Sequence, residues 1–195
     1  MANKEPKVKV QNLTKRFGDL LVLDNLNFEV EEGEFLCIVG PTGCGKTTFL
    51  NSLTRLYEPT AGDILVNGIP VNPKKQNISY IFQEYSSFPW LTVEQNIRFG
   101  LEIKKTPKAE ADANVEEMLD IVGLTKFRNY YPSQLSISML QRVAIARAFA
   151  TKPELLLMDE PYGQLDIDLR FKLEDELIKL WKKDGYDRTV YHSQH

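Results

Sequence analysis

Residues 35–57 read FLCIVGPTGCGKTTFLNSLTRLY. The opening residues FLCIV are apolar, as in a buried strand, and the residues from Lys46 onward have the apolar spacing of a helix. Between them, Gly40–Thr48 fit the pattern G-x-x-x-x-G-K-[ST], in the strand, loop and helix context that this pattern requires. The stretch therefore predicts a phosphate-binding loop.

The residue types in this loop match that chemistry. Glycines let the backbone curl, so that successive N–H groups and the start of the helix point at a polyphosphate. Lys46 supplies a positive charge to the terminal phosphates, and the Thr47 hydroxyl is placed to ligate Mg²⁺. An ordinary glycine-rich turn is the alternative. The predicted phosphate-binding residues are Gly40, Pro41, Thr42, Gly43, Cys44, Gly45, Lys46, Thr47 and Thr48.

A second apolar stretch ends in two acids. Leu155–Met158 are apolar, and Asp159 and Glu160 follow them. In a parallel sheet these carboxylates would lie at the edge that carries the loop. Asp159 suits holding Mg²⁺ through water, and Glu160 suits orienting or deprotonating a water for in-line attack on a γ-phosphate. Taken without the loop, the same residues read as a strand that runs into a solvated acidic turn.

The remaining chain shows both helical and strand periodicity. Apolar or alternating segments predict strands at 8–13, 25–30, 34–40, 63–68, 78–83 and 154–160. Apolar residues three and four apart predict helices at 46–57, 92–103, 109–123, 136–150 and 166–185. We therefore expect a β-rich start, an α/β core and a helical insert.

Composition excludes several classes of function. The chain has 24 Lys+Arg and 27 Asp+Glu and lacks a long basic run, which argues against a nucleic-acid partner. Cys37 and Cys44 support neither a disulfide framework nor a zinc cluster. No apolar stretch approaches the roughly 20 residues that span a bilayer, and residues 1–10 are too polar for a signal peptide. We expect a cytosolic protein that serves a membrane only through a partner.

The chain resembles the ATP-binding subunits of ABC transporters. The resemblance rests on segments that occur in this order: GPTGCGKTT, YIFQE, FPWLTVEQNIRFGL, YPSQLSISMLQRVAIARAFA, PELLLMDEPYGQLD and LWKKDG. FPWLTV and MDEPYGQLD look like the nitrate/sulfonate/taurine importer group. The resemblance implies ATP and Mg²⁺ as cofactors and an α/β P-loop NTPase fold, in which a RecA-like core has a mainly parallel sheet. It also implies an N-terminal antiparallel β subdomain and a helical insert.

The resemblance also implies domain boundaries and further site residues. Residues 1–83 and 148–195 would form the nucleotide-binding core and 84–147 the helical subdomain. Gln83 matches the glutamine that touches Mg²⁺ or the attacking water. Phe17 matches the aromatic residue that stacks on adenine, although a core position is an equal alternative. Asp166 matches an acid that helps to arrange paired active sites, and it is also a plausible helix N-cap.

Two partner surfaces are implied in the same way. Tyr85, Phe88, Pro89 and Trp90 lie where the family receives a helix of the membrane subunit; packing inside the helical subdomain is the alternative. In the family, a Leu-Ser-Gly-Gly signature caps the γ-phosphate held by a second subunit, but here Leu135 and Ser136 precede Ile137 and Ser138. Because β-branched Ile137 should obstruct that approach, we expect a weakened nucleotide sandwich. Leu140 also stands where this group usually has Arg.

The C-terminal segment is the second departure from the family. The resemblance implies a strand ending in a histidine that contacts the γ-phosphate, and the count from Thr189 gives His195 that role; His192 is a substitute, and either could simply be exposed. Residues 191–194 are too polar for a buried parallel strand, so we expect no such strand there. The family continues beyond this histidine, so the fold is expected to be C-terminally truncated.

Three functions compete. The first is a peripheral ATPase subunit of an importer at the cytoplasmic face of the membrane, which pairs with a second copy or a homologous ATP-binding subunit. It would drive transmembrane permease subunits, to which a solute-binding protein delivers the solute. The second is a nucleotide-binding subunit impaired in hydrolysis. The third is a soluble relative that acts on DNA or ribosomes, and the lack of basic surfaces or coiled-coil insertions disfavours it.

Overall fold

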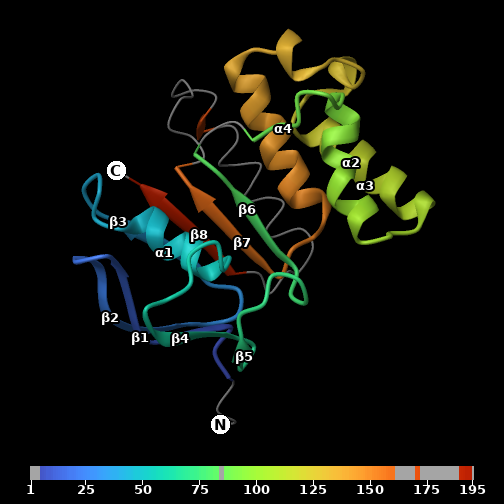
Figure 1. Ribbon diagram of the computed structural model, residues 1–195. Coiled ribbons are helices and arrows are strands. Elements are labelled where there is room, and N and C mark those ends of the chain that lie inside the picture. Colours follow the sequence, from blue (N-terminus) through green and yellow to red (C-terminus); the bar gives the residue numbers. More distant parts are fainter. Residues whose placement is uncertain (1–4, 84–85, 161–169, 172–188, 195) are drawn as a thin grey trace. The chain divides into compact units, whose positions relative to one another are not determined.

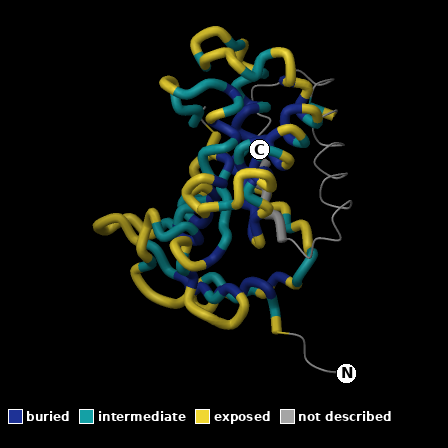
Figure 2. The backbone as a smooth tube through the Cα atoms, turned by 90° about the vertical axis from the view of Figure 1, so that its right-hand side faces the viewer, coloured by how far each residue is buried: buried dark blue, intermediate teal, exposed yellow. Residues whose placement is uncertain are grey.

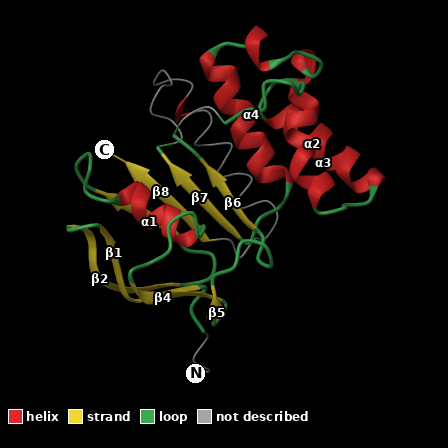
Figure 3. Ribbon diagram, in the orientation of Figure 1, coloured by secondary structure: helices red, strands yellow, loops and turns green. Residues whose placement is uncertain are grey.

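The computed structural model describes residues 5–83, 86–160, 170–171 and 189–194 (Figure 1). These residues divide into two compact units. The first contains residues 5–80, 154–160 and 189–194, and the second contains residues 81–83, 86–153 and 170–171. Strands and a single described helix, α1, build the first unit, whereas the longer helices α2, α3 and α4 belong to the second (Figure 3).

An antiparallel sheet forms the N-terminal part of the first unit. Its central strand, β1, pairs antiparallel with β2 on one side and with β4 on the other. Val8 of β1 lies opposite both Val30 and Val66, which places three buried valines side by side. This confirms the predicted antiparallel subdomain. The strands are β1 (Val8–Phe17), β2 (Leu20–Val30), β4 (Ala61–Val66) and β5 (Ile69–Pro70), in the order β2-β1-β4-β5.

A second sheet carries the loop and the acidic pair. It consists of β3 (Phe35–Val39), β6 (Ile78–Ile81), β7 (Leu155–Asp159) and β8 (Thr189–Gln194), in the order β3-β8-β7-β6. The strand β8 pairs in parallel with both β3 and β7. Because these three strands run the same way, their carboxyl ends share one edge. The phosphate loop follows β3 at that edge, and Glu160 follows β7.

The pairing of β8 overturns one expectation. Residues 191–194 were expected to be too polar for a buried parallel strand, yet His192 lies opposite both Cys37 and Met158, and Ser193 lies opposite Ile38 and Asp159. A ladder is made by backbone N–H and C=O groups, which every residue here supplies whatever its side chain. Polarity was therefore the wrong criterion.

The helix α1 (Lys46–Leu53) lies between the two sheets and contacts β7 of one and β2 of the other. Its Phe49, Leu50 and Leu53 are buried in the main hydrophobic cluster. The helix ends earlier than the predicted Tyr57, because the Thr54 N–H closes the last turn on Leu50 and Arg55 takes a left-handed backbone at φ 57°. Figure 2 shows buried and exposed stretches alternating along the chain.

Helices α2, α3 and α4 pack on one another in the second unit. Thr92 and Gln95 begin α2 with a capping box, in which each side chain accepts a backbone N–H of the other. The helical ranges are α2 (Val93–Ile103), α3 (Lys108–Ile121) and α4 (Ile137–Ala150), with short 3₁₀ turns η1 (Thr125–Phe127) and η2 (Pro132–Gln134). Of the expected helix 166–185, only Arg170 and Phe171 are described, and both are helical.

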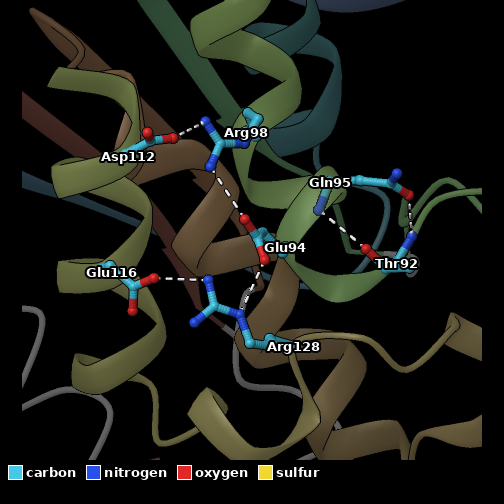
Figure 4. A network of polar contacts seen from close by, with 7 residues as sticks. All are labelled: Thr92, Glu94, Gln95, Arg98, Asp112, Glu116 and Arg128. Atoms are coloured by element: carbon cyan, nitrogen blue, oxygen red, sulfur yellow. Dashed lines mark hydrogen bonds and ion pairs between the residues drawn. The ribbon is translucent and has the colours of Figure 1, made fainter. Parts of the chain in front are cut away.

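An ion-pair cluster joins α2 to α3 and to the end of η1 (Figure 4). Glu94 accepts from Arg98 at 3.1 Å and from Arg128 at 2.9 Å. Arg98 also reaches Asp112 at 2.6 Å, and Arg128 reaches Glu116 at 2.6 Å. The hydrogen bond from Arg128 is the largest cause that lowers the pKa of Glu94 below its ordinary value, followed among the lowering causes by the bond from Arg98. The cluster thus ties α2 and α3 together at their solvent-facing sides.

No helix in the described part of the chain is long and apolar enough to cross a lipid bilayer.

Candidate functional site

Two glycines of the loop adopt backbone conformations that other residues rarely take. Gly43 has φ 80° and Gly45, the N-cap of α1, has φ 99°. A Cβ on Gly43 would meet nothing within 4 Å, so only its backbone conformation favours glycine there. A Cβ on Gly45 would lie 3.0 Å from the Leu23 side chain and 3.2 Å from the Val22 carbonyl. Gly45 therefore allows the start of α1 to pack closely on β2.

Lys46 folds back over this loop. Its ammonium donates to the carbonyl oxygens of Gly40 at 2.7 Å and Pro41 at 3.2 Å, and lies 4.0 Å from the thiol of Cys44. The side chain is only 7% exposed, so a positive charge is held inside the curve of the loop. Thr42, Cys44 and Thr47 are exposed around it. The exposed loop and its charge form a cradle that suits a polyphosphate.

Asp159 is the last residue of β7 and is only 2% exposed. The Tyr80 hydroxyl, on the neighbouring strand β6, donates to Asp159 Oδ2 at 3.2 Å. Burial, followed by the charge of Asp159, raises the pKa of Tyr80 well above its ordinary value of 10.0. The tyrosine therefore stays neutral and remains a donor to the carboxylate. Sequence reasoning missed Tyr80, because no local signal tells which strand lies beside β7.

Glu160 has a left-handed backbone, with φ 47°. This conformation is uncommon for a residue other than glycine, and such residues concentrate at functional sites. Glu160 is partly exposed, directly after a carboxylate that is buried. The sharp change of direction at the end of β7 therefore separates a buried acid from one that can reach solvent.

The donor set fits Mg²⁺ held together with a phosphate. Thr47 presents an exposed hydroxyl at the start of α1, and Asp159 a carboxylate at the same edge of the parallel sheet. Both are hard oxygen ligands, which Mg²⁺ prefers. Within the described residues, no group of three or more His, Cys, Asp or Glu could form a metal cage. Magnesium sites built from one or two protein oxygens plus substrate phosphates need no such cage.

Phe17 ends β1 and is 43% exposed, so it is no core residue. Its ring meets Tyr57 edge to face, with centroids 5.3 Å apart. The Lys15 ammonium lies 4.8 Å from the Phe17 centroid and also donates to the Glu58 carbonyl at 2.7 Å. An aromatic ring held on the surface by its neighbours is available for stacking. The sequence suggested Phe17 but not its two supports.

The signature segment begins α4. Ser136 is the N-cap, and its Oγ accepts from the Met139 N–H at 3.3 Å and lies 3.2 Å from the Ser138 Oγ. Ile137, the first residue of the helix, is 52% exposed. The start of this helix is therefore accessible, with the isoleucine side chain exposed at its first position.

The structure describes some of the remaining predicted site residues and not others. Gln83 is exposed and belongs to the second unit, so its catalytic and metal-binding role stays a prediction. Asp166, Tyr85 and His195 lie outside the described residues. For His192, the structure gives the backbone of β8 and its pairing.

In the segment after Gln83, Phe88 is packed internally and Trp90 is exposed. The ring of Phe88 packs on Phe99 at 4.4 Å and on Trp90 at 5.6 Å, inside the helical unit. Trp90 itself is 69% exposed. Phe88 thus packs as the internal alternative expects, and a partner role for Trp90 stays a prediction.

Comparison with known proteins gives matches over most of the chain. A family model described as ABC transporter matches residues 23–163. An ABC transporter ATP-binding protein of Methanocaldococcus jannaschii is 45% identical over 193 residues, which cover 97% of this chain and 72% of that protein. The sulfate/thiosulfate import ATP-binding protein CysA of Synechocystis is 45% identical over 174 residues, which cover 88% of this chain and 49% of that protein.

A solved structure agrees with these matches. It is a dimeric ATP-binding cassette in a post-hydrolysis state, bound to ADP and phosphate. Its TM-score is 0.86 at 35% sequence identity, and the alignment covers 96% of this chain and 88% of that one. The likeness therefore includes the fold of both the strand-rich and the helical parts.

Proposed function

This chain belongs to the ABC transporter family as one of its ATP-binding domains, and from that premise we propose that it hydrolyses ATP to power an importer of a small solute. The import of sulfate and thiosulfate named for the Synechocystis relative supports an importer. The segments FPWLTV and MDEPYGQLD favour the nitrate/sulfonate/taurine group. We propose residues 1–83 and 148–195 as the nucleotide-binding core and 84–147 as the helical subdomain.

In this proposal the first unit binds the nucleotide through the loop. Backbone N–H groups of residues 42–48 and the Lys46 ammonium hold the phosphates, and Phe17 stacks on the adenine. Thr47 and Asp159 hold Mg²⁺, aided by Gln83. When bound, the metal supplies charge neutralisation to the phosphates. Glu160 orients the attacking water and accepts its proton, a role that its partly exposed position beyond Asp159 permits.

The partners follow from the same proposal. The related cassette that was solved as a dimer supports pairing with a second copy or with a homologous ATP-binding subunit. Ser136, Ile137, Ser138 and Asp166 would face the partner's nucleotide. Trp90 and its neighbours would receive the permease subunits, at the cytoplasmic face of the membrane, and a solute-binding protein would act through the permease. No nucleic-acid partner is proposed.

The observation that carries the proposal is the loop itself, in which two positive-φ glycines precede a buried lysine at the start of α1. The test is Mg²⁺-dependent ATP turnover by the purified chain over a series of protein concentrations. We expect turnover that rises faster than linearly, because two chains form the site, and that disappears in Glu160→Gln. A chain that fails to bind ATP, with Lys46→Met as the non-binding reference, would refute the proposal.

A second candidate function rests on Ile137. An exposed β-branched side chain at the first position of α4 would hinder close approach to a phosphate, while the chain's own loop and acids are in place. The chain would then bind ATP and rely on a partner with a Leu-Ser-Gly-Gly signature. ATP binding without turnover, followed by turnover after such a partner is added, would favour this function over a homodimeric ATPase.

A further inference from the structure

Arg147, in the last turn of α4, holds the segment that follows Gln83. Its guanidinium donates through Nη1 to the Ser86 carbonyl at 2.7 Å and through Nη2 to the Ser86 hydroxyl at 2.6 Å. It also lies over the ring of Phe88, 5.0 Å from the centroid. Two short charge-assisted hydrogen bonds and a stacked ring fix this backbone more firmly than one bond could.

Asn96, on α2, holds the same segment from the other side. Its side chain is fully buried, and its Oδ1 accepts from the Phe88 N–H at 2.8 Å while its Nδ2 donates to the Phe88 carbonyl at 3.2 Å. The same Nδ2 lies 3.0 Å from the carbonyl oxygens of Leu91 and of Thr92. Residues 86–88 are thus fastened both to α4 and to α2.

The partners described for Arg147 are all neutral: a carbonyl, a hydroxyl and a ring. Burial lowers the pKa of its guanidinium, which means that its charge is partly desolvated. Holding a desolvated cation with neutral partners is a costly way to pack a helix, because an apolar residue would avoid the desolvation. The arginine instead fixes the positions of the Ser86 carbonyl and hydroxyl relative to α4.

We propose that Arg147 is a positioning residue that makes residues 86–88 move as one body with α4. The inference rests on the proposed function, in which Gln83 contacts the nucleotide and Ser136 faces a partner site. Ser86 follows Gln83 closely in the chain, and Ser136 caps the other end of α4. Movement of residues 86–88 is thereby shared with α4, which carries Ser136 at its other end.

The matched control is Arg142 on the same helix. It is also partly buried, burial also lowers its pKa, and its Nη1 donates to a backbone carbonyl, that of Val122, at 3.0 Å. Arg142→Met therefore removes a comparable arginine from α4 and leaves residues 86–88 untouched. Any effect that both substitutions share reports on the stability of the helix and not on the contact between Arg147 and residues 86–88.

The first measurement is amide hydrogen exchange of a peptide covering residues 86–91 in the nucleotide-free chain. We expect exchange about tenfold faster in Arg147→Met and unchanged in Arg142→Met, because two hydrogen bonds from a charged group are lost only in the former. Arg147→Lys keeps the positive charge but lacks the two parallel N–H groups of a guanidinium. Its exchange rate should lie between those of wild type and Arg147→Met. Equal exchange in wild type and Arg147→Met, or equal acceleration in both Met variants, overturns the proposal.

The second measurement follows Trp90 fluorescence on addition of MgATP, in a Trp181→Phe background. Arg147→Met should keep ATP affinity within about twofold of wild type, because the phosphate loop is intact. It should lose most of the fluorescence change, because Phe88, on which Trp90 packs, is then no longer held to α4. A full change in Arg147→Met overturns the positioning role. Failure of the wild type to bind ATP refutes the proposed function instead. The exchange experiment needs no nucleotide, so it still tests whether Arg147 holds residues 86–88 to α4. If Arg147→Met does not fold, Ser86→Ala and Arg147→Lys give the same tests.

Discussion

The Tyr80 hydroxyl donates a hydrogen bond to the buried carboxylate of Asp159 across two neighbouring strands of the parallel sheet. A buried carboxylate needs hydrogen-bond donors, since an unpartnered one would be strongly destabilising. Tyr80 supplies one such donor without adding a charge. A neutral donor leaves the negative charge of Asp159 available to a cation, which a lysine in the same place would neutralise.

Tyr80→Phe should change the stability of the chain in alkaline solution. The pKa of Tyr80 is raised in the folded state. At a pH below the ordinary pKa of 10.0, Tyr80 therefore makes its full contribution to the free energy of unfolding. Above that pH the unfolded chain ionises while the folded one stays protonated, and wild type loses about 1.4 kcal/mol per pH unit relative to Tyr80→Phe. Urea unfolding of both proteins at several pH values between 8 and 11 measures the difference in the free energy of unfolding. A constant difference across this range would contradict the raised pKa.

Glu94→Gln should weaken the helical unit by about 1–2 kcal/mol near neutral pH, because it breaks the centre of the ion-pair cluster. The pKa of Glu94 is lowered in the folded state, so this contribution is present above its ordinary value of 4.5 and is lost as the pH falls through the folded-state pKa. Thermal unfolding at neutral and at acidic pH checks both statements. Glu102→Gln, at an exposed position of the same helix, is the control and should change little.

Gly45→Ala should destabilise the chain more than Gly18→Ala. Both glycines have positive φ, 99° and 57°, so both variants carry backbone strain of about 1 kcal/mol or more. Only at Gly45 would the new methyl group crowd Leu23 and Val22; at Gly18 it meets nothing within 4 Å. Chemical unfolding gives the two free energies, and calorimetric titration with MgATP should show weaker binding for Gly45→Ala alone. Equal losses in the two variants would mean that the packing of α1 on β2 is unimportant.

Joint replacement of Ile137 and Ser138 by glycine should raise ATP turnover by about tenfold or more, because backbone N–H groups at the start of α4 could then approach a phosphate. The same change should lower the stability of α4 by roughly 1–2 kcal/mol, the sum of two glycine penalties. Steady-state turnover with saturating MgATP tests the first effect, with Glu160→Gln added to either background as the inactive reference. Unchanged turnover would show that Ile137 does not limit hydrolysis.

The phosphate loop could be predicted because its conformation depends on residues that are adjacent in the sequence. Gly43 and Gly45 mark backbone conformations that few residues tolerate, and Lys46 follows them at a fixed spacing. The long helices were predicted for a similar reason, since apolar spacing alone identifies them. Even there the end of α1 was misjudged, because the left-handed backbone of Arg55 leaves no trace in the apolar pattern.

What could not be predicted depends on contacts between distant segments. The bond between Tyr80 and Asp159 requires β6 to lie beside β7, and the grip of Arg147 on Ser86 requires α4 to lie beside a loop from the middle of the chain. The strand β8 was rejected because side-chain polarity was weighed, whereas its backbone pairing with β3 and β7 determines its place. The local sequence does not show that β3 and β7 are separated in the sheet and that another strand must lie between them.

The position of β8 has a consequence for biosynthesis. The phosphate loop follows β3 and the acidic pair follows β7, but these strands are not neighbours; β8 lies between them. While a ribosome is still making residues 160–188, the loop and Asp159 already exist, yet the strand that joins their halves of the sheet has not emerged. Such distant pairing forms slowly and late. A nascent chain released before Gln194 would therefore carry both nucleotide-binding motifs without the complete strand that joins the two halves of the sheet.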